Sequence, residues 1–252
     1  MLRILEVVGL TKRLGRRTAL DAVSFTVAEG QILGLFGGAG AGKTTCLSCL
    51  AGFARPDSGR IIFDGHEITG QVPRRLARAG IAWTFQIAKP FRDLTAAESV
   101  MVALRRRDHW GLAALVGSFR RSTMRRRALE LLERAGLGAA ADRQVGLLPL
   151  AMLKRLELAR ALVLEPRLIL VDEPLGGLSR DEMYPIVEII AELRAQGLTL
   201  ILAERPMRVA RDLVDRAVVL EAGRVVREGP RVERPADPPT QSRPISGAGP
   251  AF

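Results

Sequence analysis

A glycine-rich segment followed by lysine and threonine is the part of the sequence best suited to bind a phosphate group. Glycines let successive backbone N–H groups curl around phosphate oxygens, and a helix that begins at Lys43 adds the positive end of its dipole. We expect Lys43 to reach the terminal phosphates of a nucleotide and the Thr44 hydroxyl to bind Mg²⁺. A glycine-rich turn without a ligand is the weaker alternative, because an apolar strand pattern precedes the segment and a helical pattern follows it. The segment fits G-x-x-x-x-G-K-[ST] in full and consists of Gly37, Gly38, Ala39, Gly40, Ala41, Gly42, Lys43 and Thr44.

A second motif supplies two carboxylates. The apolar run at residues 168–171 predicts a buried strand, and Asp172, Glu173 and Pro174 follow it. At the carboxyl end of a parallel strand such groups face a ligand crevice. Asp172 would hold Mg²⁺ directly or through water, and Glu173 could act as general base toward an attacking water. The two carboxylates could instead cap a turn, but beside a phosphate loop the catalytic interpretation is favoured.

Short apolar runs that alternate with helical patterns predict the elements that position these residues. Expected strands are residues 4–8, at a sheet edge, and 19–27, 32–36, 60–63, 81–85, 168–171, 198–203, 217–220 and 224–226. Helical patterns cover 43–51, 95–137, 153–164, 181–196 and 207–213. Wholly apolar strands between helices indicate α/β layers with a largely parallel central sheet.

The same patterns divide the chain. We expect one domain over residues 1–230, with an inserted helical subdomain from about residue 88 to about residue 160 that has a strongly basic middle. Asp64-Gly65 predicts a hairpin turn, and Pro166 is expected to end the preceding helix. Residues 231–252 are rich in Pro, Gly and Ser with little periodicity, which predicts a disordered tail.

The two cysteines, Cys46 and Cys49, form a C-x-x-C pattern on the helix expected after the phosphate loop. A redox pair would need a partly exposed helix start in a thioredoxin-like setting. Two small buried residues are the favoured interpretation. So few cysteines in a chain that is 48% hydrophobic and 26% charged fit a globular protein of a reducing compartment.

The formal net charge of +11 permits two interpretations, a nucleic-acid partner or a basic surface suited to an anionic membrane face. Aromatic residues make up only 4% of the chain, which argues against stacking on single strands. The first ten residues carry Arg3 and Glu6 and lack the apolar stretch of a signal peptide. No run approaches the roughly 18 apolar residues of a membrane helix, so a membrane link is expected only through a partner.

Together these motifs resemble the ABC transporter ATPases, and the resemblance covers about residues 2–230. It is strongest to the longer ATP-binding subunit of branched-chain amino acid importers, because of residues 91–100 and the basic insertion at 105–127. The lipopolysaccharide-export ATPase is a similar protein without that insertion. The motifs that carry the resemblance, in the family's order, are residues 37–45 with Thr45 at their end, Gln86 in Trp83-Thr84-Phe85-Gln86, residues 156–162, and Asp172-Glu173-Pro174.

The resemblance implies a fold and a set of partners. The fold is that of a P-loop NTPase, with a parallel core sheet, an antiparallel β subdomain and an inserted helical subdomain. Two ATPase subunits, identical or different, would sandwich ATP and Mg²⁺ between them, and Gln86 would contact the γ-phosphate and the metal. The helical subdomain would dock a transmembrane permease at the cytoplasmic face of the membrane. An extracytoplasmic binding protein would contribute indirectly.

Several positions depart from the family. The signature loop, usually Leu-Ser-Gly-Gly-Gln, is replaced, and the serine that should contact the partner's γ-phosphate is absent. The switch histidine is replaced by Arg205, which stays charged and cannot shuttle a proton near neutral pH, although it could contact phosphate as a fixed cation. The aromatic residue that usually stacks on adenine falls near Leu14 or Arg16, so that stacking is lost. The signature positions are Leu148, Pro149, Leu150, Ala151 and Met152, and the loop after Asp172-Glu173 reads Gly177, Leu178 and Ser179.

Three hypotheses follow. The first is an ATP-hydrolysing subunit that powers amino acid import through a permease. The second is an ATP-binding regulatory subunit with negligible hydrolysis, because of Arg205 and the replaced signature. The third is a nucleic-acid-associated ATPase, which the charge alone motivates; such proteins usually carry coiled coils, zinc modules or two fused cassettes, and none is visible in this sequence.

Overall fold

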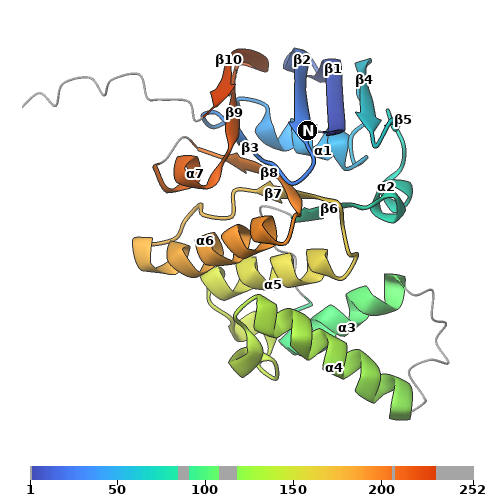
Figure 1. Ribbon diagram of the computed structural model, residues 1–252, viewed down its shortest axis with the longest axis vertical. Helices are drawn as coiled ribbons and strands as arrows, with labels where there is room; N and C mark the ends of the chain where they lie inside the picture. The colour runs from blue at the N-terminus through green and yellow to red at the C-terminus, as the bar shows by residue number, and fades with distance from the viewer. Residues whose placement is uncertain (1, 85–90, 108–117, 206–207, 231–252) are drawn as a thin grey trace, which may run out of the picture.

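The computed structural model describes residues 2–84, 91–107, 118–205 and 208–230 (Figure 1). Two sheets organise this part of the chain. The larger has six strands in the order β10-β9-β3-β8-β7-β6, parallel throughout except that β10 runs antiparallel to β9. Its strands are β3 (Ile32–Phe36), β6 (Ile81–Thr84), β7 (Leu168–Asp172), β8 (Thr199–Glu204), β9 (Arg216–Glu221) and β10 (Arg224–Pro230). The prediction of a largely parallel central sheet is confirmed.

The smaller sheet is antiparallel, with the order β2-β1-β4-β5. Its strands are β1 (Arg3–Leu14), β2 (Arg17–Ala28), β4 (Ser58–Phe63) and β5 (His66–Glu67). The hairpin turn at Asp64-Gly65 is confirmed, and both residues have positive φ, 51° and 74°. The edge position predicted for residues 4–8 is wrong, because β1 pairs on both sides. The alternation of apolar residues in a strand indicates which of its faces is buried. It does not indicate how many strands pair with it, because those strands lie elsewhere in the sequence.

Seven helices of the described residues surround the sheets. Helix α1 lies between the two sheets, α5 and α6 cover the far face of the parallel sheet, and α3 and α4 lie beyond α5 (Figure 1). Their bounds are α1 (Lys43–Leu50), α2 (Pro73–Ala79), α3 (Ala96–Arg107), α4 (Ser118–Arg134), α5 (Leu150–Leu162), α6 (Arg180–Ala195) and α7 (Arg208–Leu213). Two short 3₁₀ turns, Gly138–Ala140 and Val145–Leu147, connect α4 to α5.

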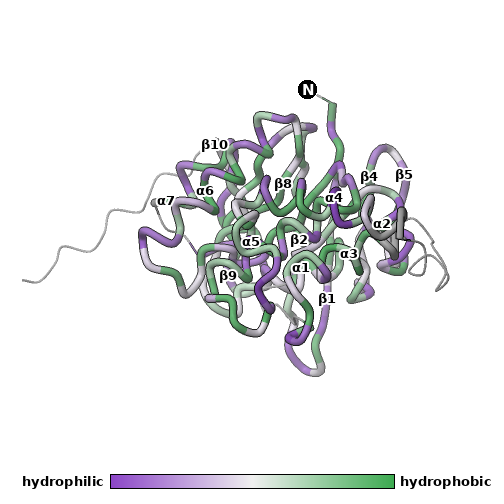
Figure 2. Tube along the Cα trace, turned by 90° about the horizontal axis from the view of Figure 1, so that it is seen from below, coloured by the Kyte–Doolittle hydropathy of each residue, from purple (hydrophilic) through white to green (hydrophobic). Residues whose placement is uncertain are grey.

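The hydrophobic core has two parts that share the parallel sheet. In β7, Ile169 and Val171 pack on the helix side, whereas Leu168 and Leu170 pack between the two sheets. Because successive side chains of a strand point to opposite faces, a strand buried on both faces must be apolar throughout. This explains why residues 168–171 of β7 form an unbroken apolar run, and Figure 2 shows hydrophobic residues through the interior of the trace.

Element bounds differ from the predictions in a few places. Helix α5 begins at Leu150, three residues before the predicted start, and it ends at Leu162, before Pro166. Glu165, which precedes that proline, has φ 46°. Helix α2 was not predicted from the sequence. The helical insertion at about 88–160 stays a prediction, and the tail at 231–252 lies outside the described residues.

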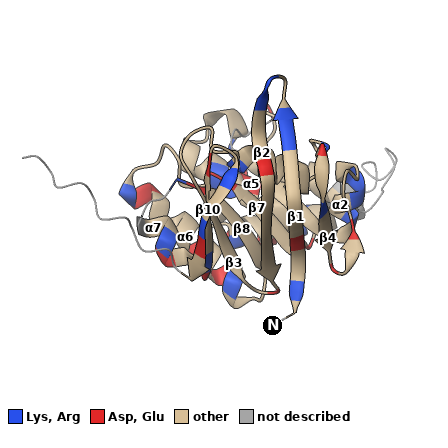
Figure 3. Ribbon diagram, turned by 90° about the horizontal axis from the view of Figure 1, so that it is seen from above, with Lys and Arg blue, Asp and Glu red and all other residues tan. Residues whose placement is uncertain are grey.

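Charged side chains concentrate on a few surface elements. Figure 3 shows basic residues at the tip of the β1–β2 hairpin and on α2, where Arg74, Arg75 and Arg78 are exposed. Within the described residues, no helix combines the length and apolar character needed to cross a membrane.

The antiparallel sheet depends on a close backbone approach at Gly59, which has φ 93° and where an added Cβ would lie 2.4 Å from the Gly9 carbonyl oxygen. We predict that Gly59→Ala lowers the free energy of unfolding by about 3 kcal/mol, because it adds a backbone clash to left-handed strain. Gly15→Ala is the matched control, since Gly15 has φ 59° with nothing within 4 Å; it should cost about 1 kcal/mol. Urea unfolding measures both, and equal losses would contradict the clash.

Candidate functional site

The glycine-rich loop connects β3 to α1 and is shaped by backbone contacts. A Cβ at Gly37 would lie 2.5 Å from the Leu220 carbonyl oxygen, and one at Gly42 would lie 2.6 Å from the Ala19 carbonyl oxygen. Gly42 caps α1 with φ 109°, a conformation that favours glycine. The strand–loop–helix context predicted for the phosphate loop is therefore present.

Lys43 is 4% exposed and reaches back over this loop. Its Nζ donates to the carbonyl oxygens of Gly37 at 2.9 Å and Gly38 at 3.1 Å, and it lies 3.6 Å from Glu173 Oε1. A buried ammonium needs such partners. The side chain is thus placed where it can exchange loop oxygens for phosphate oxygens.

Asp172 ends β7 and is 2% exposed. Its Oδ1 lies 3.4 Å from Thr44 Oγ1, and its Oδ2 has no hydrogen-bond partner among the described residues. Burial raises the pKa of Asp172 to about 6, although the Thr44 hydrogen bond opposes the shift. A buried carboxylate oxygen without a partner is the condition that a bound cation relieves.

The pair formed by Thr44 and Asp172 fits Mg²⁺. Hydroxyl and carboxylate oxygens are hard ligands of the kind Mg²⁺ takes, and the ion commonly completes its octahedron with phosphate oxygens and water. Within the described residues, no group of three or more His, Cys, Asp and Glu side chains could hold a metal. The donor set therefore fits an ion that arrives with a nucleotide.

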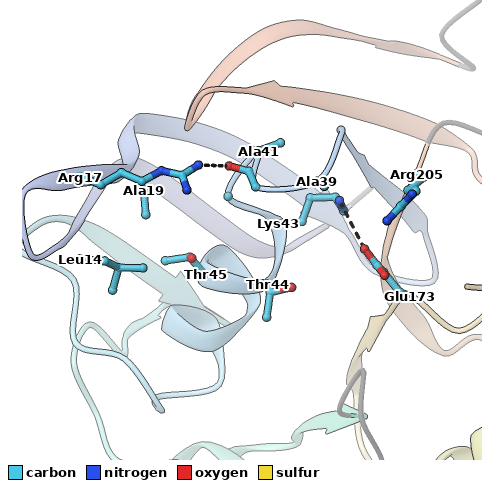
Figure 4. A pocket seen from close by; sticks show the side chains of 12 residues that line it. Leu14, Arg17, Ala19, Ala39, Ala41, Lys43, Thr44, Thr45, Glu173 and Arg205 are labelled. Atoms are coloured by element: carbon cyan, nitrogen blue, oxygen red, sulfur yellow. Dashed lines mark hydrogen bonds and ion pairs between the residues drawn. The ribbon is translucent and has the colours of Figure 1, made fainter.

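Glu173 follows Asp172 in a left-handed conformation, with φ 44°. Its N–H donates to the Ala203 carbonyl at 2.8 Å, and its own carbonyl accepts from Lys154 Nζ at 2.5 Å. These two contacts hold the carboxylate toward the phosphate loop (Figure 4). The predicted base thus lies beside Lys43, although its role is still a prediction.

Lys154, on α5, is a residue that our sequence predictions missed. Burial lowers its pKa below the usual range, and the Glu204 and Glu173 carboxylates oppose that shift. The sequence shows a basic residue just after the signature positions, but only the tertiary structure reveals that this residue contacts the Glu173 carbonyl.

Glu204 was also missed, because the prediction ended its strand at residue 203. It is fully buried at the end of β8, and its carboxylate accepts from the N–H of Leu175 at 2.7 Å and of Arg205 at 3.0 Å. Burial raises its pKa above the usual value. The Glu204 carboxylate thus links Leu175, in the loop after β7, to Arg205 through hydrogen bonds.

One pocket of about 250 Å³ brings together Glu173, Arg205 and the predicted loop residues 39–45, whereas Gly37, Gly38 and Asp172 do not line it. Figure 4 shows Lys43, Thr44, Glu173 and Arg205 at one end and Leu14, Arg17, Ala19 and Thr45 at the other. Arg205, at the switch position, lines the wall beside Glu173. The complete lining is Leu14, Arg17, Ala19, Ala39, Gly40, Ala41, Gly42, Lys43, Thr44, Thr45, Glu173 and Arg205. Gln86 lies outside the described residues.

The signature positions do not line this pocket. Leu148 and Ala151 are buried, Met152 packs on the helix-side core, and Pro149 caps α5. Leu150 is 46% exposed, and its Cδ2 lies 3.4 Å from where a Cβ on Gly177 would be. The loop therefore presents an apolar side chain at a position where the resemblance leads us to expect glycine.

The cysteines are buried free thiols on α1. Burial raises the pKa of Cys49 to about 11 and also raises the pKa of Cys46. Thiols that stay protonated are poor nucleophiles, so the packing interpretation is favoured over a redox pair.

Comparison with known proteins agrees with this geometry. The sequence profile described as "ABC transporter" matches residues 20–176. The chain is 37% identical over 234 residues to the high-affinity branched-chain amino acid transport ATP-binding protein BraF of Pseudomonas aeruginosa, covering 90% of this chain and 91% of BraF. It is 36% identical over 232 residues to the corresponding protein LivG of Salmonella typhimurium, with the same coverage of both.

Solved structures show the same fold. The ADP conformation of MJ1267, an ATP-binding cassette of an ABC transporter, superposes with a TM-score of 0.81 at 29% identity, covering 91% of this chain and 92% of that one. The dimeric structure of MJ0796, a bacterial ABC transporter cassette, gives a TM-score of 0.78 at 26% identity, covering 91% and 100%.

The fold and the site define a P-loop ATPase with an antiparallel β subdomain and added helices. The chain belongs to the ABC transporter family, as an ATP-binding subunit. Members of this family couple ATP hydrolysis to transport, form dimers and work with permease subunits.

We predict that Asp172→Asn stabilises the protein in the absence of Mg²⁺ and nucleotide. The pKa of Asp172 in the folded protein is about 6, whereas the usual value for aspartate is about 4. Ionisation of Asp172 therefore costs stability as the pH rises from about 4 through about 6. Urea unfolding in EDTA should show the variant more stable by about 3 kcal/mol at pH 8 and nearly equal to wild type at pH 4.

Asp93→Asn, at an exposed position, is the surface control and should change stability by less than about 0.5 kcal/mol. Adding Mg²⁺ and ATP should stabilise wild type more than Asp172→Asn. A variant less stable than wild type at pH 8 without Mg²⁺ would contradict this account of the buried carboxylate.

We also predict that Lys154→Met lowers kcat for ATP hydrolysis by at least about tenfold while the Kd for ATP changes less than twofold. The methionine keeps the unbranched side chain as far as Cε but removes the Nζ that donates to the Glu173 carbonyl. Lys154→Arg keeps a cationic donor and should lose less. Steady-state turnover beside a nucleotide titration separates the two constants, and a variant that loses affinity but not kcat would show that Lys154 does not position Glu173.

Proposed function

We propose that this chain hydrolyses ATP and that the hydrolysis powers import of branched-chain or related amino acids through a separate permease. The observation that carries the catalytic part is the convergence of Thr44 and Asp172 at 3.4 Å with Lys43 and Glu173 at 3.6 Å. The similarity to BraF and LivG over 90% of the chain supports the substrate class.

In this proposal each residue has one task. Lys43 and the N–H groups of the glycine-rich loop bind the phosphates, and Thr44 with Asp172 holds Mg²⁺, which when bound offsets charge on the phosphate oxygens. Glu173 orients the attacking water and accepts its proton. Arg205 contributes a fixed positive charge at the switch position, but it cannot relay a proton.

The proposed assembly places the chain at the cytoplasmic face of a membrane. A second ATPase subunit, a copy of this chain or a different one, would close over the pocket, and an extracytoplasmic binding protein would deliver the amino acid to the permease. Gln86 would report nucleotide binding to the permease. The exposed arginines of α2 suit a surface near anionic lipid.

A second candidate is an ATP-binding regulatory subunit with negligible hydrolysis. It is favoured by the apolar signature loop, where Pro149 has neither hydroxyl nor N–H and Leu150 is exposed. Loss of one preorganised electrostatic group typically costs about 10²–10³ in rate. The third hypothesis, a nucleic-acid-associated ATPase, still rests on net charge alone, and the relatives named above are transport proteins.

ATP turnover of the chain, alone and assembled with the permease and ATPase encoded near its gene, tests the proposal. We expect turnover in the assembly that Glu173→Gln reduces by at least about 10². Proteoliposomes carrying the complete system, with the binding protein outside, should take up labelled leucine, isoleucine or valine only when ATP is enclosed in the lumen with the ATPase subunits. Turnover at the Glu173→Gln level in every mixture would instead establish the regulatory subunit.

A further inference from the structure

The end of the pocket away from Lys43 has an unusual composition. It is formed by Leu14, Arg17, Ala19 and Thr45, and none of the described lining residues of the pocket is aromatic. Since the phosphate-binding groups occupy the opposite end (Figure 4), a nucleotide would place its base and ribose here. A base bound here would meet an apolar side chain and a guanidinium, and no aromatic ring among the described lining residues.

Arg17 is held at this end by the hairpin and by the phosphate loop. Leu14 and Arg17 pair across the β1–β2 turn, and paired residues of an antiparallel ladder lie on the same face. Arg17 Nη2 donates to the Gly40 carbonyl at 2.6 Å. A Cβ at Gly40 would lie 3.0 Å from that nitrogen, so this glycine, with φ 73°, leaves room for the guanidinium.

A guanidinium fixed in this way can recognise a base. It is planar, always charged and more weakly hydrated than an ammonium, and it stacks on aromatic rings. The hydrogen bond to Gly40 uses one of its five N–H donors and limits its orientation. The neighbouring Leu14 side chain, 54% exposed, adds an apolar surface beside it.

We propose that Arg17 and Leu14 form the base-binding platform of this chain, with the Arg17 guanidinium stacked on the purine in place of an aromatic ring. The proposal rests on the ATP-binding role of the site and adds the groups that recognise the base. Because a stacking contact reads the face of a ring and not its edge, ATP and GTP should bind with affinities within about threefold of each other.

Nucleotide titration by calorimetry tests this without turnover or a permease. Wild type, Arg17→Ala and the matched control Arg16→Ala, an exposed arginine of the same turn outside the pocket lining, are each titrated with ATP, GTP and inorganic tripolyphosphate. The Glu173→Gln background prevents consumption of ATP. We expect Arg17→Ala to weaken ATP and GTP binding by about two- to fivefold and to leave tripolyphosphate unchanged, while Arg16→Ala changes none of them.

A second variant distinguishes loss of the base contact from an indirect change in the shape of the phosphate loop. In the Arg17→Ala background, Leu14→Tyr supplies an aromatic platform and should restore the affinity for ATP without changing that for tripolyphosphate. An equal loss of ATP and tripolyphosphate affinity in Arg17→Ala would overturn the proposal, because Arg17 would then act on the phosphates or on loop shape. Unchanged ATP affinity would also overturn it. Neither outcome bears on hydrolysis or import, which the assembled complex tests separately.

Discussion

In the parallel sheet Phe36 pairs with Glu204 and Ala203 pairs with Asp172, so β3, β8 and β7 end at the same level. This register brings Lys43, on the helix after β3, to the carboxylates that follow β7. Charges buried together must compensate one another, and here Lys43 and Lys154 face Asp172, Glu173 and Glu204. The positions of the phosphate loop, Glu173 and Arg205 all depend on that shared edge of the sheet.

In this cluster of charges, the buried carboxylate oxygen Asp172 Oδ2 has no hydrogen-bond partner among the described residues. Buried polar groups are nearly always paired in proteins, and an exception at a strand end is typical of a functional site. The raised pKa of Asp172 has the same origin, because burial disfavours its charge. The stability given up at this carboxyl agrees with the proposed role of Asp172 as a ligand for Mg²⁺.

Four of the positions where we expect departures from the family lie away from the buried charge cluster. Pro149 and Leu150 begin α5 outside the pocket, and Leu14 and Arg17 form the end where the base is expected. A change at the rim of a site costs folding little, whereas a change in the cluster would leave a buried charge unpaired.

The sequence by itself determined the phosphate loop, the Asp172-Glu173 pair, the α/β class and most strands, because these depend on local patterns of glycine, charge and apolar residues. Only the tertiary structure decided the interior position of β1 and the early start of α5. It also decided which groups Lys154, Glu204 and Arg17 contact. Each of these three side chains has a hydrogen-bond partner more than ten positions away in the chain: Glu173 for Lys154, Leu175 for Glu204 and Gly40 for Arg17. No local pattern encodes such contacts, since they form only when the strand ends and the helix that follows are packed together.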